Sequence, residues 1–190
     1  MASSLAALFE KHGSDKNRNG YTCIYDSLWK NIRDKPVVIL EIGVGCKWLM
    51  GKQYEPGASL KAWAEYFPNS TVFGTDIAKD AVNLKLMNGR VTTHECNSTD
   101  EKQVKHFVNQ LRTKLNIESG PVFDIIIDDG SHLESDQIKT LRNLFMEVKE
   151  GGYYILEDIG GNMQNISYKT CRKFPPPRSL VLQCNWCEYT

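Results

Sequence analysis

The stretch Phe123–His132, FDIIIDDGSH, decides the fold, and a shorter stretch of the same design follows at Tyr153–Asp158, YYILED. Each begins as an apolar run of strand length and ends in adjacent carboxylates. Ile125, Ile126 and Ile127 are β-branched and uninterrupted, which is typical of a strand covered on both faces of a parallel sheet. We therefore predict a parallel sheet that contains both runs.

Polar side chains follow each of these two strands. In open α/β sheets the ligand binds beyond the carboxyl ends of the strands, so Asp128, Asp129, His132, Glu157 and Asp158 should gather at one sheet edge. Acids this close repel one another unless a cation joins them, and their oxygens suit Mg²⁺ or Ca²⁺ better than zinc. The alternative is that Asp129 and Asp158 are only N-caps of following helices. Two adjacent pairs of acids are more than capping needs, so we favour a metal site with a histidine beside it.

Length and composition favour one soluble α/β domain. The chain has 190 residues, 41% of them hydrophobic and 24% charged, and its formal net charge is zero. The lack of basic excess argues against nucleic acid or an anionic membrane as a partner. The N-terminus lacks the features of a secretory signal, no apolar run is long enough to span a membrane, and the cysteines are expected to be reduced. We therefore expect a cytoplasmic protein, in which Cys184 and Cys187 form no zinc site.

A strand predicted at Val37–Glu41 runs into Gly43 and Gly45. Glycines at this position let the backbone approach a ligand closely. The third glycine of the dinucleotide fingerprint is missing, because Gly45 is followed by Cys46, Lys47 and Trp48. The pair of glycines is therefore a weak signal, and it argues against an NAD site.

The next strand, predicted at Thr71–Gly74, leads to Asp76. An acid at the tip of the second strand of a βαβ unit can accept hydrogen bonds from both hydroxyls of a ribose. Asp76 could instead only cap a helix predicted at Ala78–Leu86. Its place after a strand, a glycine pair, a helix and a second strand favours ribose binding.

The remaining pattern completes an alternation of helices and strands. Helices are predicted at Ser4–Lys11, Tyr25–Ile32, Leu60–Phe67 with Ser59 as N-cap, Val104–Leu115 and Ser135–Val148, and further strands at Val91–Glu95 and Ser179–Cys184. Such alternation predicts a doubly wound, mostly parallel sheet.

Several of these stretches together resemble a class I S-adenosylmethionine-dependent methyltransferase. They are EIGVG at Glu41–Gly45, GTDI at Gly74–Ile77, DIIIDDGSH at Asp124–His132 and GGYYILED at Gly151–Asp158. Within that superfamily the chain resembles metal-dependent sugar O-methyltransferases of the macrocin and mycinamicin type, with relatives among cephalosporin-hydroxylase and rhamnosyl O-methyltransferase proteins. KHGSDK at Lys11–Lys16 and SLKAWAEYFP at Ser59–Pro68 also look like that group. The resemblance covers roughly residues 8–160.

The resemblance implies a Rossmann-like fold, a Mg²⁺-dependent activity and a role for each matching residue. It implies short N-terminal helices over residues 1–34, a cofactor- and metal-binding core over 35–160, and a shortened C-terminal segment over 161–190. It implies His132 as general base beside Asp129, and Asp129, Glu157 and Asp158 as Mg²⁺ ligands. The implied cofactor-binding residues are Glu41, Gly43, Gly45, Asp76, Asn97, Ser98, Asp128, Lys16 and Tyr21, with the segment around Ser14, Lys16 and Tyr21 folded over cofactor or substrate.

The expected reaction is methylation of a hydroxyl on a sugar or glycan. We expect neither nucleic acid nor a membrane as a partner, and a homo-oligomer is a possible assembly. A sugar hydroxyl is a poor acid, so a cation that acidifies it and a base such as His132 would both be needed. The alternatives are a catechol-type O-methyltransferase with a wall formed by Trp48, Tyr54 and Trp186, an NAD-dependent oxidoreductase, and a non-catalytic cofactor-binding module.

Overall fold

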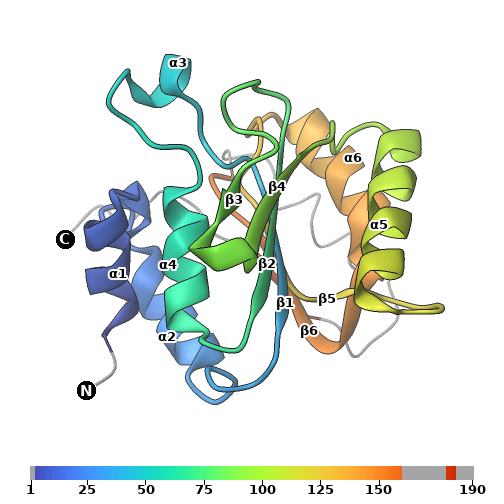
Figure 1. Ribbon diagram of the computed structural model, residues 1–190, viewed down its shortest axis with the longest axis horizontal. Helices are drawn as coiled ribbons and strands as arrows, with labels where there is room; N and C mark the ends of the chain where they lie inside the picture. The colour runs from blue at the N-terminus through green and yellow to red at the C-terminus, as the bar shows by residue number, and fades with distance from the viewer. Residues whose placement is uncertain (1–2, 160–178, 183–190) are drawn as a thin grey trace.

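The computed structural model describes residues 3–159 and the backbone of 179–182 (Figure 1). Its centre is a seven-stranded sheet in the order β3-β4-β2-β1-β5-β6-β7. The strands are β1 (Val38–Ile42), β2 (Thr71–Asp76), β3 (Lys85–Leu86), β4 (Val91–Glu95), β5 (Phe123–Asp128), β6 (Val148–Leu156) and β7 (Ser179–Leu182). Every neighbouring pair is parallel except β3–β4. The predicted doubly wound, mostly parallel sheet is confirmed.

The chain reverses its direction of winding between β1 and β5, which lie side by side at the middle of the sheet. Their register pairs Ile42 with Asp128, and Asp128 with Leu156 of β6. The next residues continue this alignment, because Asp129 N donates to Ile42 O and Glu157 N donates to Asp128 O. The acids predicted at the strand ends are therefore brought to one sheet edge, at the switch point where open α/β sheets bind their ligands.

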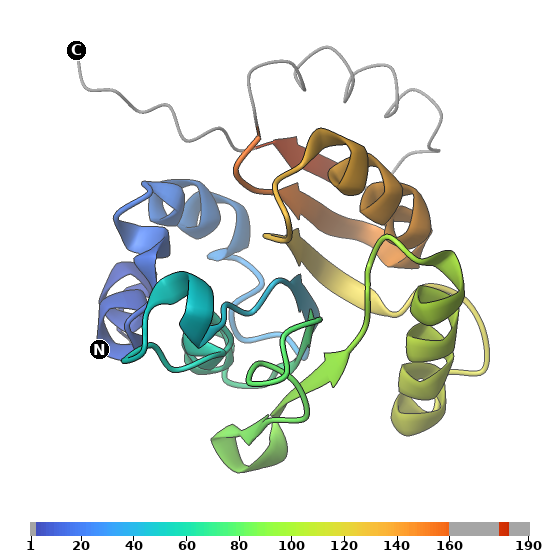
Figure 2. The same cartoon turned by 90° about the horizontal axis from the view of Figure 1, so that it is seen from above.

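Three helices cover one face of the sheet (Figure 2). They are α1 (Leu5–His12), α2 (Tyr21–Trp29) and α4 (Ala58–Tyr66), with a short 3-10 helix, η1 (Asp15–Asn17), between the first two. Ser4 caps α1, and Gly13 ends it in the left-handed conformation. Phe9, Tyr25, Trp29 and Trp63 are fully buried and their rings pack against one another. This aromatic cluster fixes the N-terminal helices on the sheet.

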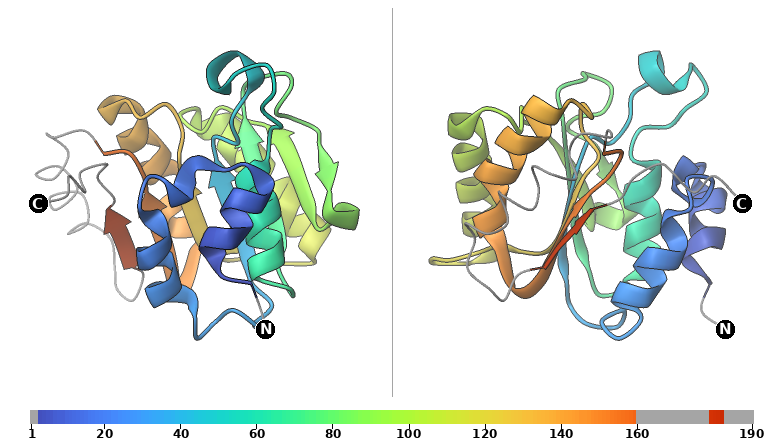
Figure 3. Two further views of the ribbon diagram at one scale, coloured as in Figure 1. Left: turned by 90° about the vertical axis from the view of Figure 1, so that its left-hand side faces the viewer. Right: turned by 180° about the vertical axis from the view of Figure 1, so that it is seen from behind.

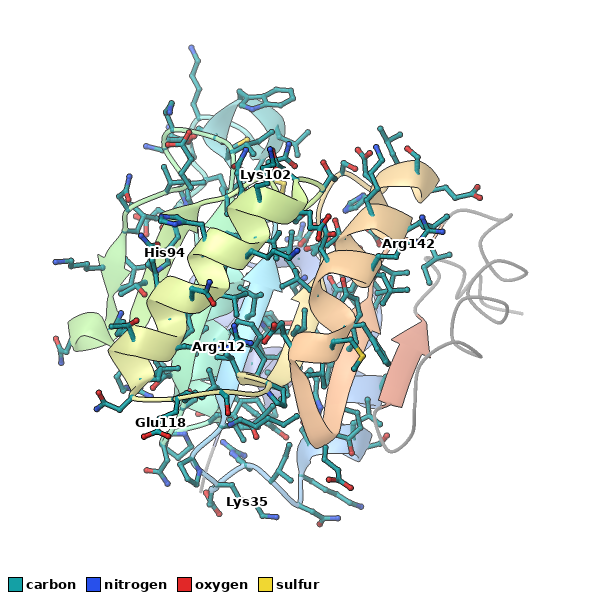
Figure 4. The ribbon with its side chains drawn as sticks, turned by 90° about the vertical axis from the view of Figure 1, so that its right-hand side faces the viewer. Lys35, His94, Lys102, Arg112, Glu118 and Arg142 are labelled. Atoms are coloured by element: carbon teal, nitrogen blue, oxygen red, sulfur yellow. The ribbon has the colours of Figure 1, made fainter. Side chains whose placement is uncertain are left out.

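Two helices, α5 (Glu101–Leu115) and α6 (Glu134–Leu144), cover the opposite face (Figure 4). The side chain of Asp100 accepts hydrogen bonds from the backbone at Lys102 and Gln103, which caps α5. Near the other end of α5, Arg112 pairs with Glu147 at 2.6 Å. A second apolar cluster lies beneath the two helices. The helices of this face start close to the predicted positions, but the second ends at Leu144 rather than at Val148, which is the first residue of β6.

The structure corrects three local predictions. No helix forms at 78–86, where the chain makes turns and the short strand β3 instead. The backbone at Asn83 and Leu84 hydrogen-bonds to Thr93, so this segment pairs with β4. Ser59 is not an N-cap, because α4 begins at Ala58 after Gly57 and the Ser59 hydroxyl is bound to Glu41. The second helix also lies earlier than predicted, at Tyr21–Trp29.

The strand predicted at Ser179–Cys184 is present over Ser179–Leu182, where it pairs with β6 at the edge of the sheet (Figure 3). Cys184, Trp186 and Cys187 lie outside the described residues. In the described part of the chain, no helix is long and apolar enough to cross a membrane.

Candidate active site

A cavity of about 820 Å³ opens above the carboxyl ends of the central strands. Its walls come from the N-terminal segment and from the loops that follow β1, β2, β4, β5 and β6. Residues from Ser14 to Asp158 therefore meet in one space. The cavity has an acid half, around Asp129, His132 and Asp158, and a cofactor half, around Gly43, Gly45 and Asp76.

In the acid half, Asp129, His132 and Asp158 form the group with the geometry of a metal site. One ligand atom from each lies within 4.8 Å of the others. His132 Nε2 is 3.1 Å from Asp129 Oδ1, and His132 Nδ1 is 3.5 Å from Asp158 Oδ2. Carboxylate oxygens with one imidazole nitrogen are a donor set that a divalent cation accepts. The residues present therefore fit the cation that the sequence predicts.

The backbone at two of these residues is unusual. His132 has φ +59° and Asp158 has φ +52°, both in the left-handed region that non-glycine residues rarely adopt. Such conformations persist where the surrounding structure fixes them, often at functional sites. Asp129 is not a helix cap, because α6 begins at Glu134 after Leu133. The capping interpretation of Asp129 is therefore wrong.

Lys16 lies inside the acid half, although the sequence predicted it among the cofactor-binding residues. Its side chain is 3% exposed, and its Nζ is 2.7 Å from Asp129 Oδ2 and 3.3 Å from Glu41 Oε1. It also donates to Glu157 Oε2. Burial lowers the pKa of Lys16, but the three carboxylates outweigh burial and raise that pKa well above its ordinary value. Lys16 is therefore a buried ammonium ion.

Glu157, a predicted metal ligand, is fully buried beneath the Asp129–His132–Asp158 group. Its Oε2 accepts from Lys16 and its Oε1 accepts from the Tyr25 hydroxyl. Ligation of a cation would make Glu157 share one of these oxygens. Its role as a ligand stays a prediction.

Tyr21 donates a hydrogen bond to Asp158 Oδ1, so it too lies in the acid half rather than the cofactor half. Burial, followed by the bond to Asp158, raises the pKa of the Tyr21 hydroxyl, which stays protonated at neutral pH. The segment around Ser14, Lys16 and Tyr21 lines the cavity, as the resemblance implies.

Each ring nitrogen of His132 faces a carboxylate. The hydrogen bond to Asp129, opposed by burial, raises the pKa of His132 and favours the imidazolium. A cation shared by the same carboxylates would act in the opposite direction. The geometry thus allows His132 to serve as a base or as a ligand, and its side chain is 41% exposed toward the cavity mouth.

Asp128, also predicted to bind cofactor, lines the cavity but is almost fully buried. The Tyr154 hydroxyl donates to its Oδ2 at 3.0 Å, and Gly130 N lies 3.4 Å from its Oδ1. Burial raises the pKa of Asp128 to about 7. These hydrogen bonds stabilise the loop after β5, and the same carboxyl group also lines the cavity, where it could contact a ligand.

The cofactor half is built from backbone. Gly43 and Gly45 have φ +79° and +74°. A Cβ at Gly43 would lie 2.0 Å from the carbonyl oxygen of Asp129, and one at Gly45 would lie 2.6 Å from the Tyr54 hydroxyl. Only glycine fits either position. Tyr54, which the sequence had offered only as a wall for an aromatic substrate, packs directly over Gly45.

Asp76 organises the loops of the cofactor half. Its Oδ1 accepts from Ile77 N and Ala78 N at 2.7 and 2.9 Å, and its Oδ2 accepts from Val44 N at 3.0 Å. No helix follows, so Asp76 is not a helix cap, but its oxygens do hold two adjacent loops. The cavity exposes it beside Gly43 and Gly45, where the predicted ribose contact would lie.

Glu41, which the resemblance implies as a cofactor-binding residue, is not among the residues that line the cavity. It is fully buried and held by Ser59 at 2.8 Å, by Trp63 Nε1 at 2.7 Å and by Lys16. Sequence reasoning missed Ser59 and Trp63 as partners of Glu41. Their spacing on one face of α4 is the available signal, but Ser59 is predicted above as an N-cap rather than as a partner of Glu41.

Asn97 and Ser98, which the resemblance implies as cofactor-binding residues, line the cavity. Asn97 Oδ1 accepts from Thr99, and Ser98 Oγ is 2.9 Å from Thr140 Oγ1. Nearby, Gln137 Oε1 is buried without a hydrogen-bond partner among the described residues. No pattern in the sequence singles out Gln137.

Apolar side chains form the mouth of the cofactor half. Trp48 is 81% exposed, and Leu49 and Met50 share with it the short helix α3 (Lys47–Met50), which projects from the body (Figure 3). Ile77 is also exposed beside them. Trp48 and Tyr54 both line the cavity, as a wall for an aromatic substrate requires.

Comparison with known proteins gives a consistent result. No family model matches the chain. The chain is 35% identical over 159 residues to the 8-demethyl-8-(2-methoxy-alpha-L-rhamnosyl)-tetracenomycin-C 3'-O-methyltransferase of Streptomyces olivaceus, which covers 82% of this chain and 36% of that protein. It is 32% identical over 141 residues to the mycinamicin VI 2''-O-methyltransferase of Micromonospora griseorubida, covering 73% of this chain and 31% of that protein.

Among solved structures, the chain is similar to the MycE methyltransferase of the mycinamycin biosynthetic pathway in complex with Mg and SAH. The TM-score is 0.69 at 27% identity, over 90% of this chain and 42% of that one. A complex of MycE with Mg, SAH and mycinamycin VI gives a TM-score of 0.68 at 27% identity, over 88% of this chain and 39% of that one. The chain thus spans about a third of the length of the curated relatives it matches.

Proposed function

From the premise that this chain is a homologue of sugar O-methyltransferases and shares the fold of MycE, we propose that it transfers a methyl group from S-adenosylmethionine to a sugar hydroxyl with the help of Mg²⁺. One observation carries the proposal. The Asp129–His132–Asp158 group and the Gly43–Gly45 loop with Asp76 open into the same cavity. A methyl donor held at one half would face an acceptor held at the other.

The cofactor half supplies close backbone approach and fixed carboxylate oxygens. Gly43 and Gly45 let the methionine part of the donor lie against the chain, and Asp76 is placed to accept hydrogen bonds from ribose hydroxyls. Asn97 and Ser98 would border the adenine. A sulfonium methyl is already electrophilic, so the protein need only hold it in line with the attacking oxygen.

The acid half would prepare the acceptor. When bound, a divalent cation acidifies a sugar hydroxyl that it ligates and fixes its direction. Asp129 and Asp158, with Glu157 as a further candidate, would hold that cation. His132 would take the hydroxyl proton on a ring nitrogen that is released from its carboxylate when the cation binds. The general-base role of His132 is part of the proposal.

The acceptor class follows from relatives of Streptomyces olivaceus, whose names specify rhamnosyl compounds. We propose a glycoside with a hydroxyl that can reach His132 at the cavity mouth. The relatives are about three times as long as the part of them that matches this chain. We therefore also propose that further polypeptide, or a second subunit, closes the acceptor side of the cavity.

The apolar mouth favours a second candidate, an aromatic or otherwise apolar hydroxylated acceptor of the catechol type. Trp48, Leu49 and Ile77 offer it a contact surface. That surface lies on the cofactor side, because Ile77 directly follows Asp76 and Lys47 N of α3 donates to Asp80 Oδ2. This position favours the sugar acceptor.

The test is transfer of radiolabelled methyl groups from S-adenosylmethionine to a panel of rhamnosides and catechols, with Mg²⁺ or with chelator. We expect label on a rhamnoside only when Mg²⁺ is present, and loss of that label in Asp129→Asn. The matched control is Glu118→Gln, an acid-to-amide change in an exposed loop at the opposite end of β5. Metal-independent transfer, or transfer to catechols alone, would contradict the proposal.

A further inference from the structure

Lys16 places a positive charge where the fold concentrates negative ones. Five carboxylates converge on the acid half and its floor, those of Glu41, Asp128, Asp129, Glu157 and Asp158. Glu41, Asp128 and Glu157 are at most 1% exposed. Among the residues that the structure describes, Lys16 is the one lysine or arginine with a side-chain nitrogen within 4.0 Å of any of them.

Neutral donors satisfy part of this cluster. Ser59 and Trp63 donate to Glu41, Tyr25 donates to Glu157, and Tyr154 donates to Asp128. Hydrogen bonds of this kind spread a negative charge but do not cancel it. A buried charge without a partner is strongly destabilising, so without a cation in the cluster these acids would have to become protonated or move.

The N-terminal segment holds Lys16 in place independently of the cluster. The Ser14 side chain accepts from Lys16 N at the start of η1, and α1 is packed by Phe9 against Trp63. Lys11 and His12 at the end of α1 both contact Glu65 of α4, at 2.7 and 3.0 Å. Lys16 therefore reaches the acids from an anchored turn.

The contacts of Lys16 divide the cluster into two parts. Its Nζ engages Glu41, Glu157 and the Oδ2 atom of Asp129. Asp129 Oδ1, His132 and Asp158 are left facing one another at the cavity side. The inner part is thus partly compensated by the protein, and the outer part stays open to a ligand.

We propose that Lys16 is a built-in counter-ion that holds the inner carboxylates in place without metal, so that a divalent cation joins a cluster that is already formed. The inference rests on the proposed function for the cation, but the counter-ion role stands without it. Lys16 then acts as a positioning residue, through Asp129 and Glu157, rather than by touching the reacting atoms.

The first test is a double-mutant cycle on thermal unfolding in chelator, with Lys16→Met, Glu41→Gln and both together. Loss of Lys16 alone leaves buried acids unpaired, and we expect the melting temperature to fall by about 10 °C. Removing the Glu41 charge as well should restore part of that loss, because one unpaired acid is gone. Simple addition of the two single losses would overturn the proposal.

The second test compares the rise in melting temperature that Mg²⁺ causes in each variant. In Lys16→Met the cation must also compensate the inner acids, so we expect the rise to be about twice that of the wild type. Lys105→Met, which removes an exposed lysine paired with Glu101 on α5, should behave as the wild type. An equal or smaller rise in Lys16→Met would overturn the proposal.

The combined outcomes separate the two proposals. Should Lys16→Met fold only with Mg²⁺ present, the counter-ion role is supported directly. Should it fail to fold with or without Mg²⁺, the Lys16→Met/Glu41→Gln chain decides, because recovery of folding supports the role and continued failure overturns it. A wild-type chain that Mg²⁺ does not stabilise, with coupling still present in the cycle, contradicts the proposed metal and leaves the role of Lys16 intact.

Discussion

The two halves of the cavity are built by different means. The acid half consists of charged side chains, drawn from the N-terminal segment and from the ends of β5 and β6, and it is held by ion pairs and tyrosine hydroxyls. The cofactor half consists of backbone, with two left-handed glycines and with Asp76 bound to three peptide N–H groups. Charge defines the first, and shape defines the second.

This difference predicts different responses to mutation. Changes of charge should act on the acid half and leave the cofactor half working, whereas an added methyl group should act on the cofactor half through sterics. The halves meet at Gly43, whose Cα packs against the backbone of Asp129.

Gly43→Ala should have the largest effect, because it breaks both halves at their contact. The new Cβ would lie 2.0 Å from the Asp129 carbonyl oxygen, at φ +79°. Backbone on both sides must move, and we expect a loss of about 4 kcal/mol or more in the free energy of unfolding. Urea denaturation of the variant and the wild type measures this loss. Gly13→Ala, at φ +77° with no atom within 4 Å, should lose only about 1 kcal/mol, and equal losses would contradict the steric account.

His132→Asn should lower turnover by about 10²- to 10⁴-fold, the range for loss of a general base. Asparagine tolerates the left-handed backbone at this position better than alanine does. S-adenosylmethionine affinity should not change, since His132 lies in the acid half. Unchanged Mg²⁺ affinity identifies a base, and weakened affinity identifies a ligand. His106→Asn, on the exposed side of α5, is the control, and a fully active His132→Asn chain would remove His132 from the mechanism.

Asp128→Asn should make the free energy of unfolding of the protein less dependent on pH. Burial raises the pKa of Asp128 from 3.8 to about 7, so the wild type is favoured when this carboxyl is protonated and loses that contribution as pH rises through 7. Relative to the wild type, the variant should gain up to about 4 kcal/mol of unfolding free energy between pH 4 and pH 7. Denaturation at a series of pH values checks this, and a difference that shrinks as pH rises would contradict it.

Asp76→Asn should have the smallest effect and confine it to the cofactor half. The amide nitrogen cannot accept the hydrogen bonds that one carboxylate oxygen now receives, so we expect S-adenosylmethionine to bind about tenfold more weakly. Mg²⁺ should stabilise the variant as much as the wild type. Loss of the Mg²⁺ response in Asp76→Asn would show that the halves are not independent.

The halves also differ in how far the sequence predicts them. Three consecutive isoleucines before Asp128 and an apolar run before Glu157 identify buried strands, and parallel strands must bring their carboxyl ends together. That is why Asp129, His132 and Asp158 could be grouped from the sequence. Gly43 and Gly45 were a weaker signal, because a glycine in the sequence is compatible with a positive φ but does not require one.

Long-range and turn contacts lay beyond sequence reasoning. Lys16 sits in a polar loop and meets Asp129 across 113 positions, so no local pattern places it among the acids. The segment 78–86 has a helical composition, but its backbone donors are taken by Asp76 and Thr93, and tertiary pairing with β4 overrides the local preference. Ser59 was assigned to the helix end because the buried Glu41 that binds it could not be seen.

The most direct test of the two-part site is calorimetric titration of S-adenosylmethionine, and then of S-adenosylhomocysteine, into the chain with Mg²⁺ and again with chelator. We expect both forms to bind with micromolar dissociation constants that chelation hardly changes, because their contacts lie in the cofactor half. Failure of both forms to bind would contradict the assignment of Gly43, Gly45 and Asp76, and with it the proposed methyl transfer.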